Sequence, residues 1–441
     1  MDTLRAWTRE LGFAWRETRL RSCVLVVPAV VGFFAPLALL KNRSIAPLFA
    51  SRLVSSAGVG FGQLALAWGV MGLGYGAAEL SVVLACKAAP AVLMVGVGVA
   101  GDRFRRHHVL VSAEFLASAA WLGLGACFLT DKASLPLLCG LAVLSGVATA
   151  MFLPTIRGIV ADLLTGQSRR GGNALVSQTE SAGLLIGLAS SGVVVSTVGA
   201  GWAATARGLL CVVSALLLGL LKTLRHRHSG GITGDLRVGW REFSSCRWVW
   251  TMALQFTVLI VAAASFIEVI GPLYMAQGRG GAWGWGIVTA CEALAALVGA
   301  LVGARLRVDR PILVATALPA TAAIPMLFVS SGCSWTIIAL AMAVPGLCQA
   351  AYYVIWTTAL QEHFSAEVLV RVNSWSIVAS YLLAPVALLT IGPAVEAVGP
   401  ASAAFVTGIS VLAATALALL SVYSARLNRP ASASQPEPAA S

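Results

Sequence analysis

Apolar residues in this chain are gathered into segments of about 20 positions, which short stretches with charge, glycine or proline separate. An α-helix of that length crosses the hydrocarbon core of a bilayer, because each residue adds about 1.5 Å along its axis. The pattern therefore predicts an all-α polytopic membrane protein with twelve transmembrane helices. The predicted spans are 46–71, 79–100, 108–129, 135–156, 173–198, 202–221, 249–275, 283–304, 311–330, 335–357, 372–395 and 401–424.

The composition supports this class of protein. Of the 441 residues, 58% are hydrophobic and 11% are charged, whereas soluble domains carry roughly 25% charged residues. The formal net charge of +12 is spread over short clusters between apolar segments, while a nucleic-acid interface needs its basic residues on one soluble face. The composition therefore argues against nucleic acid as a partner, and membrane lipid is the expected surrounding.

Basic residues are divided unevenly between the two sets of loops. Short loops rich in Lys and Arg stay on the cytoplasmic side of a membrane. One set of loops and ends contains Arg103, Arg105, Arg106, Arg157, Arg169, Arg170, Lys222, Arg225, Arg227, Arg237, Arg241, Arg247, Arg305, Arg307, Arg310, Arg371, Arg426 and Arg429. The other set contains Lys132, Arg207 and Arg279. We therefore expect a multi-pass protein of the cytoplasmic (inner) membrane, with both ends of the twelve-span body in the cytoplasm.

The longest interior break in the apolar pattern, from Lys222 to Trp248, divides the spans into six and six. The halves repeat landmarks, since Gly101-Asp-Arg-Phe-Arg-Arg after the second span has a counterpart in Gly303-Ala-Arg-Leu-Arg-Val after the eighth. Two related six-helix bundles with a binding site near the bilayer midplane are a common transporter construction. The predicted parts are an N-terminal segment 1–44, a first bundle 45–222, a linker 223–248, a second bundle 249–425 and a disordered tail 426–441.

The N-terminal segment has its own pattern. Leu4, Trp7, Leu11 and Trp15 follow helical spacing among five arginines, as in an amphipathic helix that lies on an anionic leaflet. The next run, Cys23–Leu40, is of about the minimum spanning length and contains two prolines. A crossing here would move the arginines to the outer face, so we favour an interfacial or re-entrant segment, with a thirteenth span as the alternative.

Residue types that build metal or catalytic sites are scattered. The nine cysteines occur singly, without a C-x-x-C pair, and the five histidines lie in predicted loops beside arginines. Neither spacing fits a metal site or a disulfide framework, and we find no nucleophile motif. We therefore expect no enzymatic activity, no cofactor and no metal.

Several motifs resemble one transporter family. These motifs are Gly98–Arg106, Phe152-Leu-Pro154, Arg310-Pro311, Trp356-Thr-Thr-Ala-Leu-Gln361 and Arg371-Val-Asn-Ser374. Through them the chain resembles the major facilitator superfamily, and within it the drug and natural-product efflux branch that includes macrolide and enterobactin exporters.

The resemblance implies alternating access by rocking of two six-helix domains, usually with proton antiport. In such proteins the aspartate of the first motif, here Asp102, resembles a latch that faces the start of the eleventh helix near Asn373. A carboxylate at that helix start would gain from unpaired backbone N–H groups. Arg103 and Arg106 would add links across the same inner gate.

Five ionisable residues fall inside predicted spans, where a charge is costly and usually functional. They are Lys87, Glu114, Glu180, Glu268 and Glu292. Small residues follow Glu180 and Glu292 at +3, +7 and +11, which lets helices approach closely, although glycine is frequent enough here for chance matches. We expect Glu180 and Glu292 to face the moving interface, and one of them or Glu268 to take up a coupling proton. Lys87 is expected to form a structural pair and Glu114 to support the inner gate.

The predicted tenth span carries a polar and aromatic stripe. Gln349, Tyr352, Tyr353 and Trp356 stand at i, i+3, i+4 and i+7 on one helix face. Tyr and Trp near a helix end also serve as membrane-interface anchors. Because the resemblance assigns the tenth helix to the cavity wall, we expect Gln349 and Tyr352 to line a substrate cavity.

Further cavity candidates come from other spans. They are Gln63, Trp68, Phe152 and Gln255. Gln255 and Glu268 lie about 140° apart around one helix, at 100° per residue, so these two are not expected to line the cavity together.

A cavity with few fixed charges suits an amphipathic cargo better than a sugar, which needs several convergent polar side chains. The expected function is therefore export of a small amphipathic organic compound, a drug or natural product, with protons as the coupling ion and a monomer as the working unit. An uptake permease for a small organic solute is the alternative, and an integral-membrane enzyme is a distant one.

Overall fold

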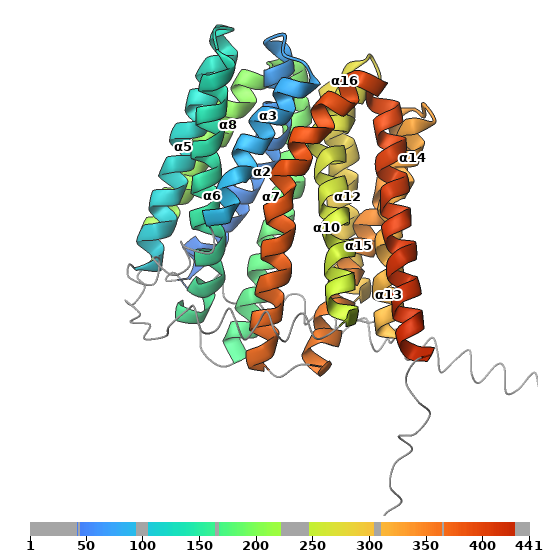
Figure 1. The fold of residues 1–441 in the computed structure, drawn as a ribbon. Coiled ribbons are helices and arrows are strands. Elements are labelled where there is room, and N and C mark those ends of the chain that lie inside the picture. Colours follow the sequence, from blue (N-terminus) through green and yellow to red (C-terminus); the bar gives the residue numbers. More distant parts are fainter. Residues whose placement is uncertain are drawn as a thin grey trace, which may run out of the picture.

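The computed structural model describes residues 42, 45–93, 105–163, 167–221, 247–303, 310–363 and 366–427. The expectations for the N-terminal segment up to Lys41, for the linker 223–246 and for the tail from 428 onward fall outside these residues. Nearly all of the described chain is helical, and the long helices stand side by side (Figure 1).

Within its described residues, the first half of the fold contains six helices and one short 3-10 turn. They are α2 (Ala46–Gly72), α3 (Ala77–Ala88), η2 (Ala89–Leu93), α5 (Arg106–Thr130), α6 (Leu135–Leu163), α7 (Gln167–Thr197) and α8 (Ala200–Gly219). The second half has more interruptions. Its elements are α10 (Arg247–Ser265), η3 (Phe266–Ile270), α11 (Gly271–Ala276), α12 (Gly281–Gly303), α13 (Pro311–Ala317), η4 (Leu318–Ala322), α14 (Ala323–Ser330), α15 (Trp335–His363) and α16 (Ala366–Leu427).

Among the described residues, ten helices are long and apolar enough to cross a membrane. One of these stretches, Leu383–Ser421, contains Gly399 at φ 80°, ψ 160°. This backbone conformation favours glycine, and it breaks α16 into two helices that run in opposite directions (Figure 1). With α3 and η2 as a further, shorter helical stretch, the arrangement is consistent with the twelve predicted spans.

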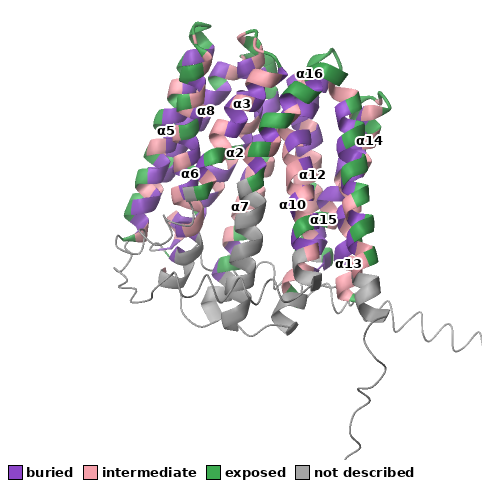
Figure 2. Cartoon of the chain, viewed as in Figure 1, coloured by how far each residue is buried: buried purple, intermediate pink, exposed green. Residues whose placement is uncertain are grey.

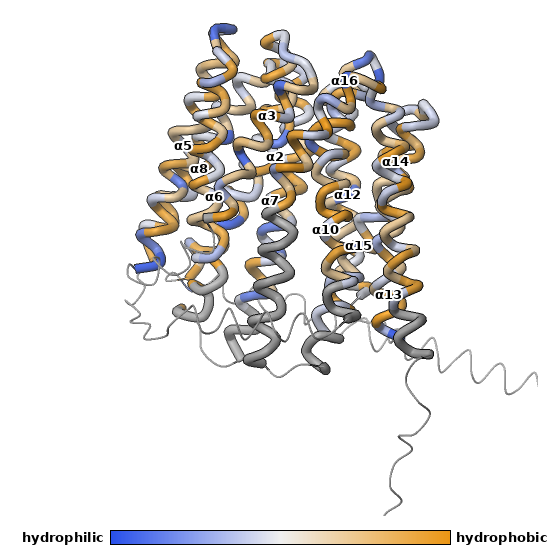
Figure 3. The backbone as a smooth tube through the Cα atoms, viewed as in Figure 1, coloured by the Kyte–Doolittle hydropathy of each residue, from blue (hydrophilic) through white to orange (hydrophobic). Residues whose placement is uncertain are grey.

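The lateral surface of the bundle is strongly apolar. Large side chains such as Leu216, Leu340 and Leu417 are 61%, 75% and 67% exposed. Figure 2 shows such exposed positions along the outside of the helices, and Figure 3 shows hydrophobic residues over most of their length with hydrophilic ones gathered near the ends. An apolar surface of this extent is stable against lipid and not against water.

Two ends of the bundle are distinguished below. The basic end is the end at which α2 begins and α8 finishes, where the arginine-rich loops are expected. The far end is the opposite one, at which α2 finishes and α12 begins. α2, α7 and the first part of α16 run from the basic end to the far end, whereas α8, α12 and α15 run in the reverse direction.

The two halves touch at the far end. A Cβ on Gly286 of α12 would lie 2.8 Å from the Cα of Gly192 in α7, so the two backbones meet without intervening side chains. Near the same end, Glu396 of α16 accepts a hydrogen bond of 2.9 Å from the backbone N–H of Ala78 in α3. A carboxylate at a helix N-terminus is favourably placed for the helix dipole. These contacts bring the two halves together at the far end.

Candidate functional site

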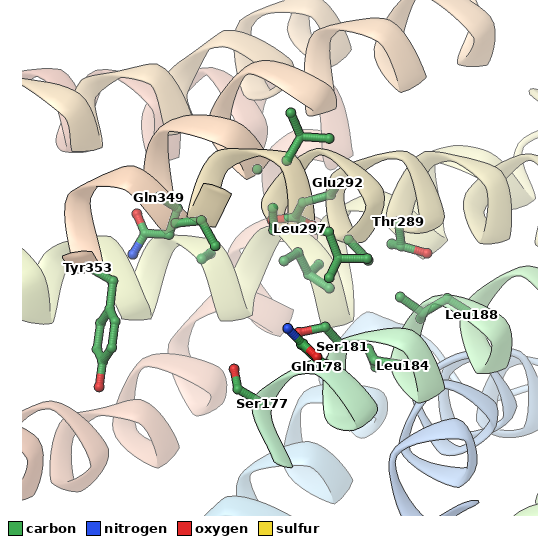
Figure 4. Close-up of a pocket in the computed structure, with 18 of the residues that line it drawn as sticks. Ser177, Gln178, Ser181, Leu184, Leu188, Thr289, Glu292, Leu297, Gln349 and Tyr353 are labelled. Atoms are coloured by element: carbon green, nitrogen blue, oxygen red, sulfur yellow. The ribbon is translucent and has the colours of Figure 1, made fainter. Parts of the chain in front are cut away.

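A cavity of about 960 Å³ lies between the two halves, the size of a site for a small organic molecule. α7 forms one wall, and α12 and α15 form the opposite one (Figure 4). Leu188 and Thr289 lie toward the far end, and Ala174 and Val354 lie toward the basic end. The cavity therefore extends from the middle of the bundle toward the basic end.

The lining is mostly apolar, with polar groups at intervals. The polar lining residues are Gln63, Ser177, Gln178, Ser181, Glu268, Thr289, Glu292, Gln349 and Tyr353. In Figure 4 Ser177, Gln178 and Ser181 come from α7 and face the wall that carries Glu292 and Gln349. Such a lining fits an amphipathic molecule, because apolar walls take its body and a few polar groups fix its orientation.

Close helix packing fixes the position of Glu292. Gly346 of α15 faces the backbone carbonyl of Glu292, and Gly299 of α12 faces the backbone of Leu347, in both cases too closely for a Cβ. α12 and α15 therefore pack backbone to backbone. Glu292 itself lines the cavity, and its carboxylate has no hydrogen-bond or ion-pair partner among the residues that the structure describes.

Glu268 is paired across the interface between the halves. Its Oε2 lies 3.4 Å from Nζ of Lys87, which belongs to α3. Glu268 lies in the π-helical turn η3 (Phe266–Ile270), a local widening often found at functional sites. Both side chains are a little over a quarter exposed, and Glu268 lines the cavity.

Glu180 is paired within the first half. Oε1 of Glu180 accepts hydrogen bonds from Nη2 of Arg52 at 2.6 Å and from Nε at 2.9 Å. Arg52 is 7% exposed, and its guanidinium lies 4.8 Å from the centre of the Phe152 ring. Sequence reasoning missed Arg52. The signal was present, because an arginine a few residues into an apolar span needs a partner.

Arg207 corrects the predicted loop assignment. The loop count put it on the far side of the membrane, whereas it lies inside α8 and is 9% exposed. Its Nη1 donates to the backbone carbonyl of Ser55 at 2.7 Å, and a side chain on Gly58 would collide with it. The prediction was wrong because an isolated arginine near the start of an apolar run resembles a loop residue in a hydropathy profile.

Arg207 belongs to a buried polar cluster in the first half. Glu114 of α5 is 3% exposed and accepts a hydrogen bond of 2.9 Å from Oγ of Ser214. Arg52, Arg207 and Glu114 together line a small pocket of about 90 Å³. Together with Glu180, the partner of Arg52, the cluster contains two arginines and two carboxylates, whose formal charges balance.

The tyrosines of α15 are placed differently from the expectation. Tyr352 is 3% exposed and does not line the central cavity. It lies between the rings of Phe256 and Trp356, at centroid distances of 5.9 and 6.4 Å. Tyr353, about 100° further around the helix, lines the cavity. Gln349 and Gln63 also line the cavity.

Three other cavity candidates lie elsewhere. Gln255 is buried in the second half, where its Nε2 donates to the Thr316 carbonyl at 2.8 Å and to Oγ1 of Thr415 at 3.1 Å. Glu268 lines the cavity and Gln255 does not, as their angular separation predicts. Trp68 packs against the large buried hydrophobic cluster that both halves share, and Phe152 lines the small pocket beside Arg52.

The predicted inner gate is only partly within the described chain. Asp102 and Arg103 lie outside the described residues, and so does the side chain of Asn373, whose backbone belongs to α16. Arg106 is the first residue of α5. The latch between Asp102 and the eleventh span therefore stays a prediction.

Comparison with known proteins places this geometry in a family. The sequence profile of the Major Facilitator Superfamily matches residues 29–387. A crystal structure of the nucleoside transporter NupG, a D323A mutant, superposes with a TM-score of 0.71 at 11% identity and covers 86% of this chain and 100% of its own. A bacterial homologue of the human lysosomal transporter Spinster, inward-facing and unoccupied, gives a TM-score of 0.66 at 15% identity over 86% of this chain and 97% of its own. No curated protein sequence matches.

Proposed function

Because the chain belongs to the major facilitator superfamily, we propose that it exports a small amphipathic organic compound, a drug or natural product, by alternating access. The observation that carries this proposal is the 960 Å³ cavity between the halves, closed at the far end and extending toward the basic end. Its walls are mostly apolar, and its polar groups are few and dispersed. A cargo with an apolar body and one or two polar groups complements such a site.

The orientation of the protein in the membrane determines which side the cavity faces. Arginine-rich loops favour the cytoplasm, so we assign the basic end to the cytoplasmic side of the inner membrane. The cavity then faces the cytoplasm, and the protein is in the state in which an exporter loads its cargo. Rocking of the halves about their interface would carry the site to the far side.

Proton antiport is the proposed energy source, and Glu292 is the proposed coupling residue. Of the three carboxylates predicted for this role, Glu180 is held by Arg52 and Glu268 by Lys87. Glu292 lines the cavity without a partner in the described part of the chain. An ionised carboxylate in that position is costly, and a proton removes the cost. The predicted latch of Asp102 at the start of the eleventh span would close the cytoplasmic side in the opposite state.

Uptake of a polar solute is the second candidate. The cavity presents the amides of Gln63, Gln178 and Gln349, and side-chain amides can form paired hydrogen bonds with a flat heterocycle. NupG, similar in fold, is a nucleoside transporter. Uptake would be favoured if labelled nucleosides, rather than amphipathic compounds, were carried inward.

Flux measurements in inverted membrane vesicles separate these functions. An imposed proton gradient, acidic inside, should drive accumulation of amphipathic compounds in vesicles with the wild-type protein. Collapse of the gradient with a protonophore should abolish it. Glu292→Gln should lose the gradient dependence, while Glu79→Gln, at a carboxylate that does not line the cavity, should retain it. Accumulation that is the same with and without the proton gradient, or transport only in the opposite direction, would refute proton-coupled export.

A further inference from the structure

The small pocket in the first half is a second cavity, separate from the central one. It has a volume of about 90 Å³ and lies between α2, α5, α6 and α8. Among the described residues, none lines both cavities. A water molecule takes up about 30 Å³ of the liquid, so the pocket has room for a small ion with water beside it. It is too small for an organic cargo, whose sites usually exceed about 300 Å³.

Arg207 reaches this pocket with hydrogen-bond donors that the protein does not use. The residue lines the pocket and is 9% exposed. Within the described part of the chain, its guanidinium donates one hydrogen bond, from Nη1 to the backbone carbonyl of Ser55 at 2.7 Å. Its Nε is buried without an acceptor. A buried charged group with unmatched donors is costly, so Arg207 lacks part of the surroundings that would stabilise it.

Two hydroxyl groups of α2 line the same pocket. Ser55 and Ser56 are 6% and 7% exposed, and neither hydroxyl is hydrogen-bonded to another residue in the described ranges. The third hydroxyl of the pocket, that of Thr149, donates to the backbone carbonyl of Ser145 at 3.0 Å. Unused donors from α2 and α8 thus meet at one small cavity, as they do where proteins bind an anion.

Glu114 is the acidic residue of this pocket. It belongs to α5, and its carboxylate accepts a hydrogen bond from Oγ of Ser214 at 2.9 Å. In the described part of the chain, no ion pair joins Glu114 to Arg207, although both line the pocket. Arg207 therefore has no counterion in contact with its guanidinium.

We propose that this pocket binds a small monovalent anion such as chloride, held by the guanidinium of Arg207 and the hydroxyls of Ser55 and Ser56. The anion supplies the acceptor that these three groups lack, and hydrogen bonds between ionised groups are stronger than neutral ones. The site lies apart from the cargo cavity, so it can be occupied whether or not cargo is bound. A bound anion contacts several helices at once and stabilises the first half.

The charge of the cluster requires that a proton accompany the anion. Arg52, Arg207, Glu114 and Glu180 balance one another, so an added anion leaves one negative charge in excess. A proton on Glu114 removes this excess. The protonated carboxyl can then donate a hydrogen bond to the anion and still accept the one from Ser214.

The other groups around Glu114 do not replace it as the proton acceptor. Arg52 and Arg207 stay charged at all physiological pH values, and Cys211 of α8, which lies beside Glu114, is neutral when protonated. Glu180 is held by Arg52 through two hydrogen bonds, and the α6 residues that line the pocket are uncharged. Since the anion and the proton bind together, the affinity for the anion should rise as pH falls.

Binding of radiolabelled chloride to the purified full-length protein tests the site. Chloride should bind saturably, bromide should compete with it, and gluconate, which is too large for the pocket, should not. The affinity should be about tenfold higher at pH 5.5 than at pH 7.5, because one proton is taken up with the anion. At equal ionic strength, chloride should also raise the midpoint of thermal unfolding above that in gluconate.

Three variants separate charge from space at the site. Glu114→Gln can still accept the hydrogen bond from Ser214 but carries no charge, so it should bind chloride about tenfold more tightly at pH 7.5 and without pH dependence. Arg207→Gln should lose binding. Since that change also weakens the fold, Ala148→Leu, which fills the pocket and leaves every charge in place, should lose binding as well. Gly140→Leu, on the same helix with no atom within 4 Å of its Cβ position, should bind as the wild type does.

Three results would overturn the inference. They are the absence of saturable chloride binding by the wild type, binding that is retained in both Arg207→Gln and Ala148→Leu, and equal unfolding midpoints in chloride and gluconate. The last result would mean that the pocket holds water only. Weaker binding in Glu114→Gln, or at lower pH, would reject the joint uptake of the proton and the anion. None of these measurements uses transport, so their outcome is independent of the proposed export function.

Discussion

Lys87 and Glu268 join the two halves of the protein through an ion pair in which Nζ lies 3.4 Å from Oε2. The pair lies beside the cavity, and Glu268 also lines it. Under the proposed alternating access, opening of the far end would pull α3 away from η3 and separate these two charges. The pair would then contribute to the energy difference between the two access states.

Removal of this ion pair should favour opening of the far end. Lys87→Met is expected to lower the stability of the present conformation by about 0.5–1 kcal/mol, because the pair is partly exposed to the cavity. That corresponds to a shift of about two- to fivefold in the ratio of the states. Distances between spin labels on α3 and α16 at the far end would report the shift. The charge-exchanged double variant Lys87→Glu with Glu268→Lys should return the distribution toward that of the wild type, and an unchanged distribution in Lys87→Met would contradict the assigned role.

The contact between Gly192 and Gly286 should be intolerant of side chains. Gly192→Leu would place carbon atoms where the α12 backbone now lies, and the far end should no longer close fully. A cysteine introduced at Ser177, in a cysteine-free background, should then react several-fold more slowly with a polar maleimide added from the basic end. Gly140→Leu is the matched control, since no atom lies within 4 Å of the position of its Cβ. Equal reactivity in the two variants would refute the closing role of the glycine pair.

Tyr352 and Tyr353 should have opposite effects when each is replaced by alanine. Tyr352→Ala opens a gap between Phe256 and Trp356 and should cost about 3 kcal/mol or more of stability, with little effect on ligand affinity per folded molecule. Tyr353→Ala removes an exposed ring from the cavity wall and should weaken cargo binding about tenfold with the melting temperature nearly unchanged. Thermal unfolding in detergent and equilibrium binding, measured on the same samples, separate the two. If Tyr352→Ala lost affinity and Tyr353→Ala did not, the assignment of Tyr353 to the cavity wall would be wrong.

The effects of Arg207 and Glu114 on the stability of the protein should be strongly coupled. Arg207→Leu leaves Glu114 in an interior that has lost one of its two arginines, and we expect a loss of about 2–4 kcal/mol of stability. The double variant Arg207→Leu with Glu114→Leu should lose less than the sum of the two single changes. A double-mutant cycle on thermal stability measures this coupling. Additive losses would show that the two side chains act independently.

The spans and the division into halves were predictable because hydropathy and the distribution of arginines are properties of short segments. The residues that line the cavity were harder to assign. Gln349, Tyr352 and Tyr353 all belong to one stripe of α15, yet Tyr352 packs between Phe256 and Trp356 and lies outside the cavity lining. A sequence stripe about 100° wide therefore covers both a buried face and a lining face.

Ion pairs between distant helices were also beyond the reach of sequence patterns. Glu180 and Glu268 could be identified as costly residues, yet their partners stand 128 and 181 positions away. The choice among three candidate carboxylates depends on which one lacks a partner, and that is decided only when α2, α3, α7 and η3 are assembled. The assignment of Arg207 failed for the same reason, since Ser55 lies 152 positions away in sequence.

The hydrogen bond from Ala78 to Glu396 places a charged group of the closing contact on the exposed outer rim of the protein. An exposed charge near a helix terminus interacts more weakly as salt concentration rises, since counterions screen it over about 10 Å at 0.1 M. On the orientation proposed above, the far end faces the medium outside the cell. Salt in that medium would then weaken this contact and favour opening of the far end, without any ion entering the transport path.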